Sequence, residues 1–382
     1  MSGGVAHIHV SEPRIGDAEI GAVADALRSG WISSAGPCIS AFERAWAGYC
    51  ERGHGIAVSN GTTALELAIE ALDLAPGDEV IIPTFTIISC ALAVIRAGAT
   101  PVLVDADPVT WCMDPAEVAA CVGPRTRAIM PVHIYGHPCE MDPLLNLAER
   151  HGIAIVEDAA EAHGAEYHSQ RGSTPAWRRC GSFGTSSTFS FYANKLITTG
   201  EGGMIVTDDE RLAERLRSLR NLGFRADRRF YHTELGHQYR LTNVQAALGV
   251  SQIERIDELL SRKRWLGATY NERLREVSSL ELPVEQPWAK HVYWMYGVVL
   301  RDDARMDAAE LASRLATRGI ETRPFFLGMH EQPALLDRHL FADAWYPVAE
   351  RLARRGLYLP SGLGLTDIQL ERVCDAVKEI LG

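Results

Sequence analysis

The 382-residue chain lacks several features that would assign it quickly to a class of protein. Its eight cysteines include no Cys-x-x-Cys pair, so neither a zinc site nor a disulfide framework is indicated, and we expect reduced thiols in a cytoplasmic protein. No apolar run approaches the roughly 18 residues that a membrane helix requires, and the N-terminal stretch has no leader-like pattern. These absences predict a soluble protein without a membrane partner.

The chain has fewer basic than acidic residues, with 38 Lys and Arg and 49 Asp and Glu, which gives a net charge of −11. A nucleic acid is therefore not expected as a partner. The length favours one large and one smaller domain, which we place at residues 1–255 and 256–382. His133 and His137, in the Gly- and Pro-containing stretch HIYGH, lack the helical His-Glu-x-x-His pattern, so no metal site is expected.

Short apolar stretches of strand character alternate with amphipathic helices through the first half of the chain. We expect strands at 55–58, 79–82, 101–104, 128–132 and 153–156. This rhythm predicts an α/β fold with a mostly parallel sheet, whose ligands collect at the carboxyl ends of its strands.

The remainder of the chain changes character twice. Residues 168–181 are polar and rich in turn formers, so a surface loop of unknown role is expected there. One long helix is expected at 241–265, and the rest predicts a compact α+β domain with strands at 293–300, 321–325 and 357–359.

An anion site is indicated where the first strand leads into a helix through Gly61, Thr62 and Thr63. The first N–H groups of a helix are unpaired and its dipole is positive there, Gly61 admits close approach, and the threonine hydroxyls add donors. An ordinary helix cap is the alternative.

Two further side chains follow strands of the same sheet. Asp158 ends the apolar stretch IAIVED, where a carboxylate needs a cationic partner such as a protonated pyridine nitrogen, or else caps the next helix. Phe85, in PTFT, offers a flat face for a ring to stack on, although a core phenylalanine is the commoner case.

The stretch SSTFSFYANKLITTGEGGMIVT, from Ser186 onward, holds Lys195 in a tight connection between two expected strands. A lysine fixed in this way suits Schiff-base chemistry, whereas most lysines lie on the surface. Anion donors, an aromatic face, a strand-end carboxylate, a hydroxyl-rich strand and an amine together are what pyridoxal 5′-phosphate requires.

The sequence also resembles the DegT/DnrJ/StrS family of sugar-nucleotide aminotransferases over essentially its whole length. The resemblance is carried by VSNGTTALELAI, PTFT, VEDAAEAHGA, TFSFYANKLITTGEGGMIVT and HTELGHQYRLTNVQAALGVSQIERID. It implies the fold-type I aminotransferase architecture, pyridoxal 5′-phosphate as cofactor, L-glutamate as amino donor and a homodimer with shared active sites.

The resemblance also implies roles for individual residues. Lys195 matches the Schiff-base lysine, Asp158 the partner of the pyridine nitrogen, and Glu161 a residue near the phenolic oxygen of the cofactor. Gly61, Thr62 and Thr63 match the phosphate loop, and Ser190 matches a phosphate-binding hydroxyl. Phe85 matches the stacking aromatic. Asn243 matches an asparagine that reaches the phosphate of the cofactor in the other subunit.

The substrate is implied less sharply. Glu161, with KHVYWMYGVVL and TRPFFLGMHEQP, is most similar to the branch that acts on GDP-linked 4-keto-6-deoxy sugars. A C-3 or C-4 aminotransferase acting on a dTDP- or UDP-linked keto sugar is the first alternative. A dehydratase is opposed by Lys195, and a non-catalytic sugar-nucleotide binding or sensor protein is opposed by the intact site. Phe325 and His330 are candidates to contact the sugar nucleotide; a core aromatic and a surface histidine are the alternatives.

Overall fold

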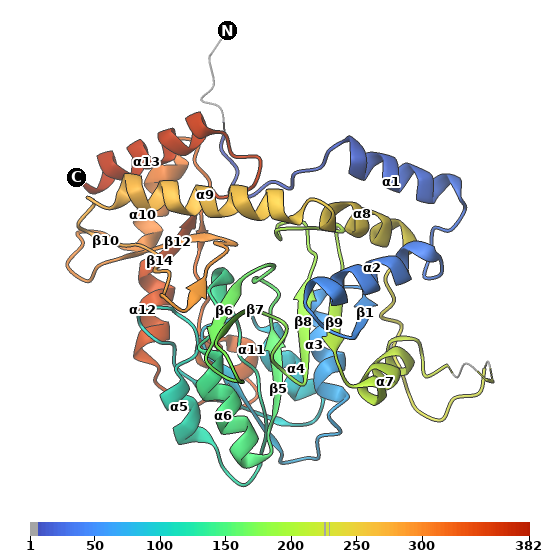
Figure 1. The fold of residues 1–382 in the computed structure, drawn as a ribbon. Coiled ribbons are helices and arrows are strands. Elements are labelled where there is room, and N and C mark those ends of the chain that lie inside the picture. Colours follow the sequence, from blue (N-terminus) through green and yellow to red (C-terminus); the bar gives the residue numbers. More distant parts are fainter. Residues whose placement is uncertain (1–6, 225–226, 229) are drawn as a thin grey trace.

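The computed structural model describes residues 7–224, 227–228 and 230–382. A seven-stranded sheet in the order β1-β9-β8-β5-β4-β2-β3 forms the centre of the larger part (Figure 1). Its strands are β1 His54–Val58, β2 Glu79–Pro83, β3 Thr100–Val104, β4 Thr126–Ile129, β5 Ala154–Asp158, β8 Ser186–Ser190 and β9 Gly203–Thr207. Six of these run in the same direction, and β9 is antiparallel to both of its neighbours. The predicted mostly parallel sheet is confirmed.

Helices pack around this sheet, so its central strands are buried on both faces. Val80, Ile81 and Ile82 of β2 are fully buried, which explains why this strand is apolar without alternation. The helices of this part are α1 Asp17–Arg28, α2 Pro37–Tyr49, α3 Gly61–Glu70, α4 Ser89–Arg96, α5 Pro115–Cys121, α6 Met141–His151 and α7 Glu210–Arg220, with the short 3-10 turn η1 Ile134–Gly136.

Residues 168–181 lie largely at the surface as expected, but they do not form a loop throughout. Instead β6 Glu166–Ser169 and β7 Ala176–Arg179 pair as an antiparallel hairpin, which β11 Ala289–Lys290 extends to three strands. The rings of His168 and Trp177 lie 4.9 Å apart across the hairpin. Backbone pairing and such cross-strand contacts hold this polar segment, and its composition alone did not reveal them.

The expected single helix at 241–265 was wrong. It is divided into α8 Asn243–Ile253 and α9 Ile256–Leu274. At the break, Arg255 leaves helical geometry, with φ −112° and ψ 9°. Its guanidinium lies 2.8 Å from the buried carboxylate of Glu19 and 3.1 Å from that of Glu258, in the first turn of the next helix. A buried carboxylate needs a cationic partner, so the ion pair with Glu19 offsets the free-energy cost of interrupting the helix.

The C-terminal part is the expected α+β unit, with a four-stranded antiparallel sheet in the order β10-β12-β14-β13. Its elements are β10 Leu280–Glu281, β12 Tyr296–Leu300, α10 Ala308–Ala316, β13 Arg323–Pro324, η2 Met329–Glu331, α11 Pro333–Leu336, α12 Pro347–Arg355, β14 Gly356–Leu359 and α13 Asp367–Leu381. The N-terminal segment joins this unit, since Ile8 pairs with Ile320 and is buried in its core.

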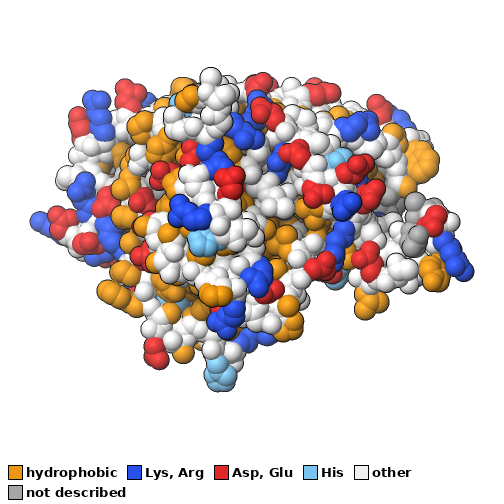
Figure 2. Space-filling model, turned by 60° about the horizontal axis from the view of Figure 1, so that its bottom comes forward, with side chains coloured by type: hydrophobic (Ala, Val, Ile, Leu, Met, Phe, Trp, Pro, Cys, Tyr) orange, Lys and Arg blue, Asp and Glu red, His pale blue; other side chains and the backbone are white. Residues whose placement is uncertain are grey.

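Two features of the structure concern a membrane or a nucleic acid as possible partners. Within the described residues, no helix is both long and apolar enough to cross a membrane. Figure 2 shows acidic and basic side chains interspersed over one face of the molecule, without a continuous basic tract on that face.

Candidate active site

The predicted site residues gather at the carboxyl ends of the parallel strands. Asp158 ends β5, Phe85 follows β2 by two residues, and the loop carrying Lys195 connects β8 to β9. The backbone bond from Ala159 N–H to Thr188 O, 2.9 Å long, ties the segment after β5 to β8. One edge of the sheet therefore brings together residues that are more than 100 positions apart in the sequence.

Lys195 lies in that connection with a partly buried side chain. Its Nζ is 3.7 Å from the centroid of the Trp294 ring and makes no hydrogen bond within the described part of the chain. Burial lowers the pKa of the amine, whereas the charges of Glu161 and Asp158 oppose that shift. The amine is thus uncommitted and can lose its proton more readily than a surface lysine.

Two buried carboxyl groups face this amine. Asp158 accepts hydrogen bonds from Ala160 N–H at 3.1 Å and from the Cys90 thiol at 3.3 Å, and burial raises its pKa. Glu161 accepts a bond of 2.7 Å from Tyr135 N–H, and burial raises its pKa to about 7. Among the described residues, no Lys, Arg or His forms an ion pair with Asp158, so this carboxylate is left for a cationic ligand.

The start of α3 forms a narrow cradle beside β8. A Cβ on Gly61 would lie 2.7 Å from the Cβ of Ser190, so only glycine lets these two segments approach so closely. Thr63 serves its own helix, since its N–H donates to Asn60 Oδ1 at 2.9 Å and its hydroxyl to Asn60 O at 2.8 Å. The N–H groups of Gly61 and Thr62 find no acceptor in the described chain and remain available to an anion.

The structure supports the cap alternative for Thr63, although its predicted contact with phosphate remains a prediction. The hydroxyl of Thr62 lies 2.8 Å from that of Ser89. The Ser190 hydroxyl accepts only a long contact, of 3.4 Å, from Tyr192 N–H, which leaves its proton free to bind a ligand.

The aromatic candidates lie in one buried cluster. Phe85 is 1% exposed, with its ring 6.0 Å from that of Tyr135 and 5.8 Å from that of Phe325. Phe325 is itself buried, and its ring lies 4.8 Å from Tyr135. Both phenylalanines are therefore core residues, as the alternative interpretation expected. The predicted stacking of Phe85 on the cofactor and the predicted contact of Phe325 with the sugar nucleotide remain predictions.

His330 is not a surface histidine, so that alternative was wrong. It is 5% exposed, with Nδ1 2.8 Å from the hydroxyl of Thr84 and Nε2 3.3 Å from a carboxylate oxygen of Glu350. The imidazole thereby joins α12 to the residue that precedes Phe85.

Asn243 is the first residue of α8 and is buried. Its Oδ1 accepts a bond from Cys38 N–H at 2.9 Å, and its Nδ2 donates to Trp31 O at 2.8 Å. Both ends of the amide are thus engaged within this chain, around the loop before α2. Its predicted contact with the cofactor of a second subunit would require these bonds to rearrange.

Sequence reasoning missed Tyr135, Trp294 and Cys90, which all contact the predicted site. Tyr135 occupies the left-handed region with φ +51°, and this strained conformation presents its N–H to Glu161. A signal was present, because Tyr135 is the centre of the HIYGH stretch, which drew attention only through its histidines. The structure gives those histidines other partners: His133 lies 3.1 Å from Glu157, and His137 Nδ1 lies 2.7 Å from Pro138 O.

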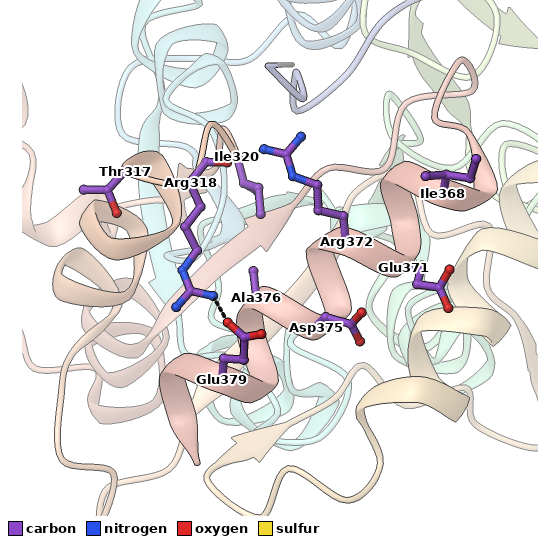
Figure 3. A pocket seen from close by; sticks show the side chains of 9 residues that line it. All are labelled: Thr317, Arg318, Ile320, Ile368, Glu371, Arg372, Asp375, Ala376 and Glu379. Atoms are coloured by element: carbon purple, nitrogen blue, oxygen red, sulfur yellow. Dashed lines mark hydrogen bonds and ion pairs between the residues drawn. The ribbon is translucent and has the colours of Figure 1, made fainter. Parts of the chain in front are cut away.

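A separate hollow lies between α13 and the turn after α10 (Figure 3). Its charged side chains include Arg318 and Glu379, which form an ion pair across it. None of the predicted site residues lines this hollow, and its second arginine, Arg372, donates to the backbone oxygen of Arg318. The hollow is therefore distinct from the site at the strand ends.

The residues present fit pyridoxal 5′-phosphate. The cradle that a Cβ on Gly61 would fill suits a phosphate group, the unpaired carboxylate of Asp158 suits a protonated ring nitrogen, and the uncommitted amine of Lys195 suits an aldehyde. The geometry thus defines a pyridoxal-phosphate enzyme of the α/β type.

Comparisons with known proteins agree. The chain belongs to the DegT/DnrJ/EryC1/StrS aminotransferase family, whose profile matches residues 13–378 and whose members depend on pyridoxal phosphate. It is 43% identical to GDP-perosamine synthase of Caulobacter vibrioides, with 98% of each chain covered. It is 41% identical to dTDP-3-amino-3,4,6-trideoxy-alpha-D-glucose transaminase of Streptomyces venezuelae, covering 90% of this chain and 87% of that one.

A solved structure supports the same assignment. DesV of S. venezuelae is 40% identical and superposes with a TM-score of 0.87, over 95% of this chain and 94% of that one. The protein is therefore a pyridoxal-phosphate-dependent sugar aminotransferase with the fold-type I architecture.

Proposed function

We propose that the protein transfers the amino group of L-glutamate to C-4 of GDP-4-keto-6-deoxymannose, which yields GDP-perosamine. The observation that carries the reaction class is the uncommitted amine of Lys195 facing the two buried carboxyl groups of Asp158 and Glu161. The likeness to GDP-perosamine synthase over nearly the full length supports the GDP-linked sugar.

The chain supplies binding and proton transfer. Asp158 would hold the ring nitrogen, the Gly61 and Thr62 N–H groups with the Ser190 hydroxyl would hold the phosphate, and Lys195 would hold the aldehyde carbon. When bound, pyridoxal phosphate supplies an electron sink and a carrier for the amino group.

Proton movement belongs to Lys195. Burial lowers the pKa of its amine, so Nζ gives up its proton more readily than a surface lysine, and in its neutral form it can accept the α-proton of glutamate. The same group, once protonated, delivers a proton to the sugar carbon in the second half of the exchange. Glu161, with a pKa of about 7, exchanges a proton with its surroundings at neutral pH, which keeps the charge around Nζ balanced.

A homodimer with shared active sites is part of this proposal. Large apolar side chains remain exposed in the N-terminal helix and the following loop, including Ile20, Leu27, Trp31 and Ile32. Tyr192, three residues before Lys195, is also exposed. Exposed apolar groups on this scale favour a protein partner, and a second copy would cover them beside the site.

The proposal also covers the location of the protein, its division into domains and the partners it does not require. The eight cysteines carry no disulfide, which supports a cytoplasmic protein. The break between α8 and α9 supports a division into domains at 1–255 and 256–382, with residues 7–12 packed onto the second. No nucleic acid, membrane or metal is required by the proposed reaction.

A second candidate substrate is a dTDP- or UDP-linked sugar with a keto group at C-3 or C-4. The relative named as a dTDP-amino-sugar transaminase, 41% identical to this chain, favours it. The test is an incubation of the protein and L-glutamate with each candidate keto sugar, followed by mass spectrometry of the sugar nucleotide. Amination of the GDP-linked sugar supports the proposal; amination of only a dTDP- or UDP-linked sugar replaces it with the second candidate.

A further inference from the structure

Cys90 is the second residue of α4, which follows the loop that carries Phe85 in the sequence, and its side chain is fully buried. Its Sγ is 3.3 Å from Oδ2 of Asp158, within the range of a thiol-to-carboxylate hydrogen bond. The hydroxyl of Thr86 lies 3.6 Å from the same sulfur. The thiol thus contacts both Thr86, in the loop that carries Phe85, and the carboxylate of Asp158 at the end of β5.

The thiol can only donate in this contact, since an ionised carboxylate has no proton to give. Burial and the negative charge of Asp158 both raise the pKa of Cys90 well above its usual value, so the sulfur keeps its proton. The other oxygen of Asp158, Oδ1, accepts from Ala160 N–H at 3.1 Å. Two donors therefore fix the plane of a carboxylate that has no ion-pair partner among the described residues.

We propose that Cys90 is a positioning residue for cofactor binding, whose thiol orients Asp158 and favours its charged form for a protonated ring nitrogen. A hydrogen bond to the charged form of a carboxylate stabilises that form, and the direction of the effect on Asp158 agrees, because the Cys90 contact lowers its pKa against the effect of burial. This inference rests on the role of Asp158 in the proposed function.

The test measures binding of pyridoxamine 5′-phosphate to the apoprotein by fluorescence titration. This ligand has no aldehyde, so its affinity reports the ring and phosphate contacts without the covalent bond to Lys195. We expect Cys90→Ala to weaken binding about tenfold, the scale of one hydrogen bond to a charged group. Cys90→Ser keeps a donor at this position and should bind within about threefold of the wild type.

Two controls separate this role from a structural one. Cys374→Ala removes another fully buried thiol, in α13, and should leave binding unchanged. The 1-deaza analogue of the ligand has a C–H in place of the ring nitrogen, so the wild type and Cys90→Ala should bind it equally.

Equal binding of pyridoxamine phosphate by the wild type and Cys90→Ala would overturn the inference. An equal loss for the 1-deaza analogue, or for Cys90→Ser, would also overturn it, because the thiol would then matter only for packing. Failure of the wild type itself to bind pyridoxamine phosphate would instead refute the cofactor assignment on which the inference depends.

Discussion

In the proposed function, amino transfer depends on Lys195, because within the described chain its amine faces the buried carboxyl groups without a hydrogen bond of its own. We expect Lys195→Ala to reduce kcat by at least about 10⁴-fold, since both the covalent attachment and the proton transfers are lost. Lys290→Ala is the matched control: it removes a partly exposed lysine that pairs with Glu166 and should leave kcat within about twofold. Substantial turnover by Lys195→Ala in a steady-state assay would refute the role.

Glu161 gives a prediction for pH. Its pKa is about 7 in the folded protein, raised from 4.5 by burial. Between these values the folded state binds more protons than the unfolded state, so stability falls as pH rises through this window. The shift corresponds to a loss on the order of 3 kcal/mol.

The measurement is urea unfolding of the apoprotein at pH 5 and pH 8, compared with Glu161→Gln. The variant is neutral at both values, so its stability should change less between them than that of the wild type. A wild-type protein that changes no more than the variant would contradict the raised pKa of Glu161.

The sequence located Lys195 and Asp158 because each is marked by local pattern, a Gly-punctuated connection for the lysine and the end of an apolar strand for the carboxylate. It did not locate Tyr135 or Cys90. The contact of Tyr135 with Glu161 depends on a backbone angle of +51°, and that of Cys90 on the tertiary placement of the start of α4 near the end of β5. Neither relation leaves a periodic trace in the chain.

At the scale of elements, His330 connects the C-terminal unit to the loop after β2. Its ring lies between Thr84 and Glu350, and the backbone bond from Met329 N–H to Thr84 O, 2.9 Å long, runs alongside. We expect His330→Ala to lower the free energy of unfolding by about 2 kcal/mol, because a buried hydroxyl loses its partner and a cavity forms.

Urea denaturation checks this, with His151→Ala as the control because His151 is exposed at the end of α6. The control should change stability by less than about 0.5 kcal/mol. Equal stability of His330→Ala and wild type would show that this contact does not join the two parts.

The errors in element prediction share a cause. The division of α8 from α9 follows from Arg255 reaching the buried Glu19, and the β6–β7 hairpin is completed on the free edge of β6 by β11, more than 100 residues away. Both depend on partners that are distant in sequence. By contrast, α13, at Asp367–Leu381, has its start signalled locally by the capping residues Thr366 and Gln369.

At the scale of the whole molecule, the exposed apolar side chains near the N-terminus predict a dimer. Light scattering during size-exclusion chromatography should give twice the 42.0 kDa of one chain. Trp31→Glu, which places a charge among these groups, should shift the protein toward the monomer. Trp345→Glu is the control, since Trp345 is 73% exposed but lies in the C-terminal unit. A wild-type monomer, or dissociation by both variants alike, would contradict this interface.

Movement of an amino group from glutamate to a keto sugar nucleotide is the function on which all of these roles depend. It is measured most directly by an absorbance titration of the purified holoprotein, first with L-glutamate and then with GDP-4-keto-6-deoxymannose. We expect glutamate to convert the spectrum of bound pyridoxal phosphate to that of pyridoxamine phosphate, and the GDP-linked keto sugar to restore it. A spectrum that does not respond to glutamate would show that the site does not perform amino transfer.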